Sequence, residues 1–169
     1  MENRVRCRWS MDSEILSAYH DEEWGVPVTE DEKLFECLTL EMFQAGLSWR
    51  TILHKRENFR AAFAHFNIRQ VKAMTEEDIK KLMNNEGIVR HRRKIEATIE
   101  NAKRCDELIK EYGGLNAFFQ QLPEDPLEKQ KILKRTFKHF GLTTAESFLM
   151  ATGMMPTQHE EGCYLHQQA

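Results

Sequence analysis

The sequence predicts an all-α fold, and three observations support this. Residues that start and end helices recur along the chain at helical spacing. No segment of four or more residues alternates cleanly between apolar and polar positions, as a half-buried strand would. No internal repeat, low-complexity tract or long linker divides the 169 residues. We therefore expect a compact helical bundle in which residues 1–169 form a single domain.

A short first helix is expected to begin at Asp12 or Ser13, because both residue types cap helices well. Apolar side chains follow it at helical spacing: Ile15, Leu16 and Tyr19. The sequence Trp-Gly-Val-Pro at 24–27 then predicts a loop.

Two further helices are expected before the middle of the chain. Thr29 and Glu32 have the spacing of a capping box, which predicts a helix that Gly46 ends. Ser48 is expected to cap the next helix, which continues to Phe63.

A second capping box and a long amphipathic pattern follow. Thr75 and Asp78 predict a helix start, and this helix should stop near Gly87. From about Arg92 a long helix with a regular apolar face is expected, and the glycines at 113–114 end it.

The last part of the sequence predicts a hairpin between two helices. A short segment, 115–122, precedes two prolines, and the following helix breaks at Gly141. This helix carries the apolar residues Ile132, Leu133 and Phe137. The final helix is expected to run from Thr143 or Thr144 to Thr152.

Composition excludes several classes of protein. A net charge of −3 argues against a general polyanion binder. Four cysteines are too few for a disulfide scaffold in a chain of this length. No apolar run approaches the roughly 20 residues of a membrane span, and the N-terminus carries no apolar leader. We expect a soluble, cytoplasmic protein with no membrane partner, and a monomer, because the sequence has no coiled-coil seam.

Glu41 is a carboxylate on the apolar side of the predicted second helix. Within about 60° of it on a helical projection lie Leu34, Leu38 and Ala45. Burying an unpaired carboxylate is costly, so such a group has a partner or a raised pKa. An internal arginine or a backbone N–H is one explanation. The nearby Gln44 and Trp49 favour another, a pocket that holds a flat cation between an acid and an aromatic face.

Two pairs of soft metal ligands lie near the ends of the sequence, Cys7 with His20 and His159 with Cys163. The i, i+4 spacing of the second pair would place both side chains on one face of a helical turn. A Cys₂His₂ set is typical of structural zinc, whereas a catalytic zinc keeps one coordination position open. We therefore expect one structural zinc ion that joins the terminal segments, and a zinc hydrolase is the less favoured alternative.

Two basic clusters are candidates for contact with DNA. One is the run 90–94, and the other is a helical stripe of Lys131, Lys134, Arg135 and Lys138. Such runs are most often solvated helix faces. The second cluster precedes a glycine hairpin and a threonine-started helix, which together offer positive charge and free N–H groups to a phosphate. This arrangement predicts a helix-hairpin-helix element that binds DNA.

Four strings of the sequence resemble bacterial 3-methyladenine DNA glycosylase I. They are AYHDEEWGVP at 18–27, LEMFQAGLSW at 40–49, KRENF at 55–59 and GIVRHRRKI at 87–95. The likeness runs through most of the chain. It implies that Cys7, His20, His159 and Cys163 bind the zinc ion.

The resemblance also assigns the other site residues. It implies that Glu41 is the catalytic acid that contacts the methylated base. It implies that Trp49, Tyr19 and Trp9 bind the base, and Gln44 joins this base-binding set from the pocket described above. It places Leu47 in the gap left by a flipped base. With the turn and the predicted hairpin, the candidate DNA-binding residues are Leu47, Gly46, Lys138, Gly141 and Thr143.

The implied activity is hydrolytic release of 3-methyladenine from alkylated double-stranded DNA, without strand cleavage. Methylation at N3 makes adenine in DNA cationic, so its glycosidic bond is already weak and the protein has chiefly to find and hold the base. The alternative is a non-catalytic, zinc-stapled DNA-binding module that captures alkylated bases.

Overall fold

The computed structural model describes residues 4–166, and none of these residues forms a strand. The α-helices in this part of the chain are α1 Glu14–Ala18, α2 Asp31–Gln44, α3 Trp49–His54, α4 Arg56–Ala62, α5 Ile68–Lys72, α6 Glu76–Met83, α7 Arg92–Tyr112, α8 Leu115–Gln120, α9 Pro126–Thr136 and α10 Leu142–Ala151. Short 3-10 turns at Arg8–Ser10 and Ala64–Phe66 and a π-helical turn at Tyr19–Glu23 complete the set. The predicted all-α class is confirmed.

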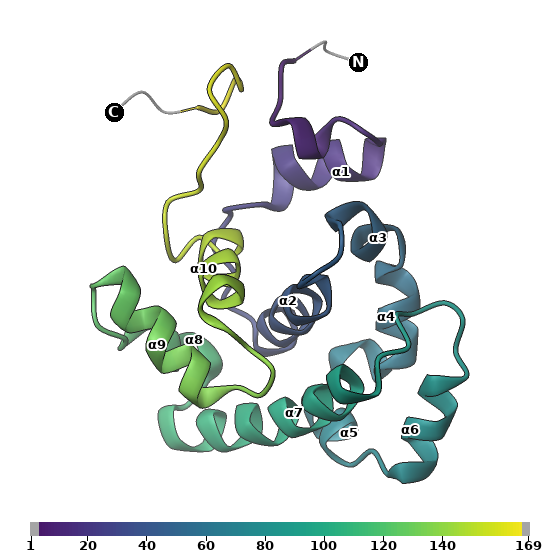
Figure 1. Cartoon of the computed structure of the whole chain (residues 1–169). Coiled ribbons are helices and arrows are strands. Elements are labelled where there is room, and N and C mark those ends of the chain that lie inside the picture. Colours follow the sequence, from purple (N-terminus) through teal and green to yellow (C-terminus); the bar gives the residue numbers. More distant parts are fainter. Residues whose placement is uncertain (1–3, 167–169) are drawn as a thin grey trace.

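The helix α2 lies at the centre of the molecule and α7 runs across one side of it (Figure 1). The two terminal segments lie next to each other at the opposite side, above α10 and α1. One cluster of buried apolar side chains joins α2, α4, α7 and α10, and its members include Phe35, Phe43, Phe59, Ile95 and Phe148. The element that carries Glu41 is therefore packed on several sides.

Three of the predicted helix starts are confirmed by their caps. The Ser13 side chain accepts a hydrogen bond from the Leu16 N–H, and the Ser48 side chain accepts one from Thr51. Thr75 and Asp78 form the predicted capping box of α6. Each side-chain oxygen satisfies a backbone donor that has no partner within the helix.

The capping box predicted from Thr29 and Glu32 is wrong. The helix α2 begins at Asp31 with Glu30 as its N-cap, and no side chain caps it. The Asp31 carboxylate instead accepts a hydrogen bond of 2.8 Å from the Leu115 N–H, at the start of α8. Since the N-cap of α8 is a glycine, this first turn takes its acceptor from a neighbouring helix, which local sequence cannot reveal.

The helix predicted from Ser48 to Phe63 is in fact two helices, because the backbone breaks at Lys55 (φ −100°, ψ 1°). The break accompanies a two-pronged hydrogen bond from Arg56 to Glu23, with distances of 2.7 and 2.9 Å. No element was predicted for residues 64–74, where α5 lies. A signal for it was present, since Asn67 caps α5 through the Gln70 N–H.

The C-terminal elements differ from expectation at two boundaries. The helix α9 ends at Thr136, so Phe137 is its C-cap and the helix does not continue to Gly141. Gly113 ends α7 in the left-handed conformation, with φ of 87°. The helix α10 begins at Leu142 with Gly141 as its N-cap, and not at Thr143 or Thr144. The hairpin 137–141 joins α9 to α10, so the helix-hairpin-helix arrangement is present.

Within residues 4–166, no helix combines the length and the apolar character that crossing a membrane requires.

Candidate functional site

Glu41 lies in the middle of α2 with only 2% of its surface exposed. Its Oε2 atom has no hydrogen-bond partner, and it is the one buried side-chain oxygen or nitrogen in residues 4–166 of which this is true. The explanation by an internal arginine or a backbone N–H therefore fails for this oxygen. Burial raises the pKa of Glu41 well above its ordinary value. An orphan acceptor of this kind is expected where a ligand supplies the missing donor.

A small cavity of about 20 Å³ lies beside Glu41, enough for about one water molecule. Apolar and aromatic side chains form much of its wall: Tyr19, Cys37, Leu40, Trp49 and Leu53. The rings of Tyr19 and Trp49 stack on each other, with centroids 5.6 Å apart and planes inclined by 25°. Inserting a base between two rings requires about 7 Å, two contact distances. The rings must therefore separate before a base can lie between them.

The other charged groups that line this cavity are neutralised by one another. Lys33 lies 2.7 Å from Glu36, and Arg56 binds Glu23 through two hydrogen bonds. Burial raises the pKa of the Cys37 thiol to about 12, so this cysteine is neutral and a poor nucleophile at pH 7. In the part of the chain that the structure describes, Glu41 is thus the charged group of this cavity that has no partner of opposite charge, and a bound cation would supply one.

Tyr19 and His20 are adjacent in sequence but belong to two different sites. They begin the π-helical turn Tyr19–Glu23, which the hydrogen bond from the Trp24 N–H to the Tyr19 carbonyl closes at 2.8 Å. Tyr19 lines the cavity beside Glu41, whereas the ring of His20 points toward the sulfur of Cys163. Single π turns often occur at functional sites.

Trp9 lies against the second of these sites. Its ring meets His20 and Trp24 edge to face, with centroids 5.5 and 5.3 Å away. It also touches the edge of Tyr19, at 6.1 Å. Trp9 is not among the residues that line the cavity beside Glu41.

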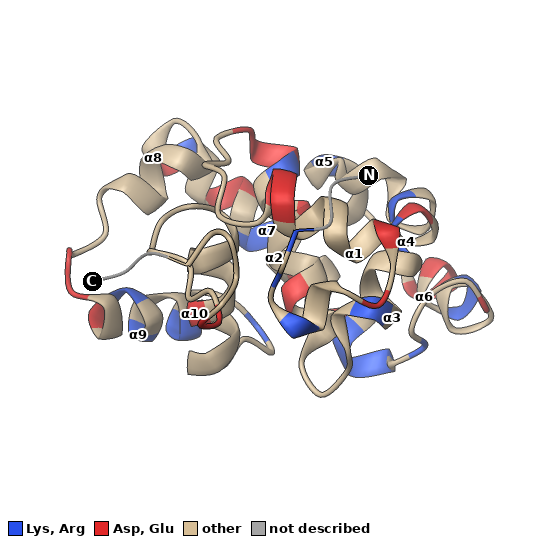
Figure 2. Ribbon diagram, turned by 90° about the horizontal axis from the view of Figure 1, so that it is seen from above, with Lys and Arg blue, Asp and Glu red and all other residues tan. Residues whose placement is uncertain are grey.

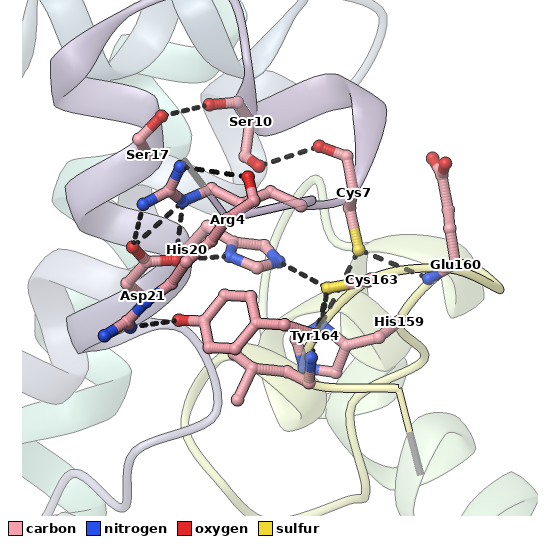
Figure 3. A network of polar contacts seen from close by, with 12 residues as sticks. Arg4, Cys7, Ser10, Ser17, His20, Asp21, His159, Glu160, Cys163 and Tyr164 are labelled. Carbon is pink, nitrogen blue, oxygen red and sulfur yellow. Dashed lines mark hydrogen bonds and ion pairs between the residues drawn. The ribbon is translucent and has the colours of Figure 1, made fainter. Parts of the chain in front are cut away.

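The four predicted metal ligands come together where the terminal segments meet (Figure 3). The sulfur of Cys163 lies 3.5 Å from His20 Nε2 and 3.6 Å from His159 Nδ1, and the sulfur of Cys7 lies 3.6 Å from the same Nδ1. A tetrahedral zinc site has sulfur–nitrogen edges of about 3.6 Å, given its bond lengths. The donor set and its spacing therefore fit a metal ion, and the cluster could hold one.

The groups around this cluster also suit a metal site. Asp21 lies 2.9 Å from His20 Nδ1, so it can hold the ring with Nε2 toward the sulfurs, and hydrogen bonds from Arg6 keep the pKa of Asp21 well below its ordinary value. Backbone N–H groups of Glu160 and Leu165 point at the two sulfurs. The segment from His159 to Cys163 is not helical, contrary to the spacing argument. A turn closed by the Cys163 N–H and the Glu160 carbonyl brings the two ligands together instead.

Residues 44–47 form a tight turn at the end of α2. Ala45 (φ −52°, ψ 118°) and Gly46 (φ 84°) have the angles of a type II turn, and the Leu47 N–H donates to the Gln44 carbonyl at 2.7 Å. The Gln44 side chain donates back to the Leu47 carbonyl at 2.7 Å, so it braces the turn and does not line the cavity beside Glu41. Leu47 is 38% exposed at the tip. The chain thus presents an apolar side chain on a rigid turn.

The hairpin carries the other predicted DNA contacts. Lys138, Gly141 and Thr143 are exposed, and His139 has a φ of 56°. A groove of about 540 Å³ runs between this hairpin and the turn, with Ala45 on one wall. Its basic residues are Arg104, Lys134, Arg135 and Lys138. Blue segments in Figure 2 mark the basic residues of α9 at one edge of the molecule.

Two of the lysine and arginine residues in the first basic run, 90–94, have partners within the protein, whereas Arg90 and Arg93 are exposed. Lys94 is buried, with 6% of its surface exposed, and donates to the Phe43 and Ala45 carbonyls at 3.0 and 2.9 Å. Arg92 forms ion pairs with Glu76 and Glu96. Sequence reasoning missed Asn101, which is fully buried and binds the hairpin backbone. The signal that identified Glu41, a polar residue on an apolar helical face, would have found it.

Comparisons with known proteins agree with one another. The sequence pattern of the methyladenine glycosylase family matches residues 9–133. DNA-3-methyladenine glycosylase 1 of Escherichia coli (strain K12) is 40% identical over 181 residues, which cover 94% of this chain and 95% of that protein.

Two solved structures are also similar. One is 3-methyladenine DNA glycosylase I from Staphylococcus aureus, with a TM-score of 0.84 and 31% identity over 97% of each chain. The other is a 3-methyladenine DNA glycosylase I in complex with 3-methyladenine, with a TM-score of 0.83 and 32% identity over 96% of this chain and 98% of that one. The chain belongs to the 3-methyladenine DNA glycosylase I family.

Proposed function

We propose that this protein removes 3-methyladenine from alkylated DNA by hydrolysis of the glycosidic bond. One observation carries the proposal most directly, namely the unpaired, buried carboxylate of Glu41 beside two aromatic rings. Family membership indicates the substrate, and the geometry of the pocket gives a physical reason why 3-methyladenine is selected over normal adenine.

The base is recognised by its charge. A 3-methyladenine base in DNA is cationic, and a carboxylate in a poorly hydrated pocket attracts a cation far more than it attracts neutral adenine. Trp49 and Tyr19 separate and stack on the two faces of the flipped base, while Glu41 accepts hydrogen bonds from its amine edge. Flipping costs a few kcal/mol, and stacking on an aromatic residue returns about 1–3 kcal/mol.

Release occurs by hydrolysis, with the sugar–phosphate strand left intact. Cleavage of the strand by a glycosylase requires an amine that attacks the sugar. The lysine that lines the cavity, Lys33, forms an ion pair with Glu36 at 2.7 Å, so its amine is not free to attack the sugar. Because the bond to a cationic base is already weak, no strong acid is needed to help the base leave.

Contact with double-stranded DNA involves the turn and the hairpin. Leu47 at the tip of the turn fills the gap that the flipped base leaves, and Gly46 allows the backbone to reach it. Lys138, Gly141 and Thr143 bind a phosphate through positive charge and the free N–H groups that begin α10. The groove that runs between these two segments supports this assignment.

The metal bound by Cys7, His20, His159 and Cys163 is one zinc ion with a structural role. Two thiolates and two imidazoles fill all four positions that zinc prefers, so no position remains for substrate. We further propose that residues 1–169 act as one glycosylase domain, as a monomer in the cytoplasm, with Trp9 and Gln44 supporting the pocket and the turn respectively.

Incubation of the purified protein with methylated duplex DNA, followed by chromatography of the released bases, tests the proposal. We expect free 3-methyladenine, unbroken strands with abasic sites, and no release of normal adenine. Binding to alkylated DNA without release of any base would instead identify a non-catalytic module. Base release that requires the metal in a fully folded protein would favour a zinc hydrolase.

A further inference from the structure

Two buried polar residues of α7 fasten the two proposed DNA-contacting segments to this one helix. Lys94 donates to the Phe43 and Ala45 carbonyls at the end of α2, immediately before the turn that carries Leu47. Asn101 donates to the Lys138 carbonyl at 3.1 Å and accepts from the Lys138 N–H at 2.7 Å. Each side chain therefore binds main-chain atoms at the base of an exposed segment, and neither one faces the solvent.

The spacing of the two residues is that of a single helical face. Seven residues separate them, which is close to two turns and about 10.5 Å along the helix axis. Because α7 is a continuous helix of 21 residues, the distance between its two attachment points is fixed. A hydrogen bond from a third residue of α7, Arg104, to the Thr136 carbonyl at 2.6 Å holds the near end of the hairpin to the same helix.

The cost of these contacts indicates that they serve more than packing. Burying an ammonium group without a carboxylate partner costs free energy. Carbonyl groups at a helix end can usually accept hydrogen bonds from water instead. The two carbonyls lie on either side of Gln44, where α2 passes into the turn. What the lysine adds is a fixed position for the turn relative to α7.

We propose that Lys94 and Asn101 are positioning residues that set the distance between the base-flipping turn and the phosphate-binding hairpin. This inference rests on the proposed function of those two segments. On duplex DNA, Leu47 has to enter the base stack while the hairpin binds a phosphate a fixed number of nucleotides away. A free base needs neither segment, since it contacts only the pocket around Glu41.

The test compares two substitutions with a matched control on the same helix. Lys94→Met keeps the length of the side chain, and Asn101→Asp keeps the acceptor for the Lys138 N–H but removes the donor. Thr98→Val is the control, because Thr98 is fully buried between them and its hydroxyl bonds only to the Lys94 carbonyl within α7. For each protein, three quantities are measured: kcat/KM on methylated duplex DNA, Kd for free 3-methyladenine by calorimetry, and Tm.

We expect Lys94→Met and Asn101→Asp to lower kcat/KM on duplex DNA at least tenfold while Kd for the free base changes less than about twofold. Thr98→Val should lower Tm without changing either quantity by more than about twofold. In combination with Leu47→Ala, the loss caused by Lys94→Met should be less than additive, because both changes act through one turn.

Two results would overturn the inference. One is a rise in Kd for the free base as large as the loss on duplex DNA, which would mean that the helix supports the whole fold. The other is no loss on duplex DNA from the folded Asn101→Asp variant, which retains most of the buried contacts. If the unaltered protein neither binds the base nor acts on DNA, the proposed function itself fails, and this outcome is distinct from both.

Discussion

Glu41 is the residue in which stability and proposed function conflict. The carboxylate is buried and one of its oxygens lacks a partner, so the folded protein is less stable than it would be with a neutral side chain. Proteins keep such a group when a ligand uses it. The residue could be identified from the sequence because helical arithmetic places it among leucines, whereas its lack of a partner required the structure.

Replacing Glu41 by glutamine should separate the two effects. We expect Glu41→Gln to lower kcat/KM on methylated DNA roughly ten- to hundredfold. A hydrogen bond to a charged group contributes about 1.5–3 kcal/mol, against about 0.5–1.5 kcal/mol for a neutral one, and glutamine also lacks the charge that attracts the cationic base. The same change should leave Tm at pH 7 unchanged or higher. Base-release assays and thermal melts check the two outcomes. A large fall in Tm would indicate that Glu41 has a structural role.

The pH dependence of stability provides an independent check. Since the folded-state pKa of Glu41 is raised above 4.5, the folded protein binds this proton more tightly than the unfolded chain does. Its contribution to stability is therefore present at low pH and is lost as pH rises through the raised pKa. The Tm of Glu41→Gln minus that of the unaltered protein should grow between pH 4 and pH 8, and a constant difference would contradict this.

Among the elements, the turn 44–47 depends on one glycine. Gly46 has a φ of 84°, and a Cβ added there would meet no atom within 4 Å, so any effect of substitution comes from backbone strain alone. We expect Gly46→Ala to cost about 1 kcal/mol and to lower Tm by about 2–4 °C. Gly46→Asn, which tolerates this conformation better, should cost less. Thermal melts of both variants measure the difference, and equal losses would indicate another cause.

The salt dependence of DNA binding tests the proposed role of the hairpin. Lys138→Ala removes one proposed phosphate contact, so the slope of log K against log salt concentration for duplex DNA should fall in magnitude by about 0.9. Lys110→Ala is a suitable control, because its ammonium is already bound to Asp106. Binding titrations at several salt concentrations give both slopes. An unchanged slope for Lys138→Ala would show that Lys138 does not contact a phosphate.

Element boundaries show where sequence reasoning succeeds and where it stops. Caps within one helix were predictable, as Ser13, Ser48 and the box at Thr75 demonstrate. The start of α2 was not, because Asp31 serves α8, which is distant in sequence. The burial of Lys94 could not be predicted from the sequence either, since its partners are carbonyl groups about fifty positions earlier in the chain.

At the scale of the whole molecule, the Cys7, His20, His159 and Cys163 cluster brings residues 7 and 163 together. With the proposed metal bound, a cross-link over a loop of this length would contribute about 4–5 kcal/mol in the simplest model. The four side chains of this cluster were predicted from the sequence, because their chemistry identifies them without knowledge of the fold. It did not predict the turn that joins His159 to Cys163.

Removal of the metal should therefore affect stability and not the chemical step. We expect about one zinc per chain by elemental analysis, and a marked fall in Tm both with chelator and for Cys163→Ser. Cys105→Ser, which replaces a buried cysteine outside the cluster, should leave metal content unchanged. Folded, metal-free protein should retain its turnover at low temperature, and loss of turnover without loss of structure would give the metal a catalytic role.

The arrangement of the aromatic side chains gives the protein two intrinsic optical reporters. Of its three tryptophans, Trp9 and Trp24 lie at the metal cluster, whereas Trp49 lies against Tyr19 in the pocket. With Trp9 and Trp24 replaced by phenylalanine, the remaining tryptophan fluorescence would come from the pocket alone. Its quenching on addition of 3-methyladenine would follow the parting of the two rings in real time, without any attached dye.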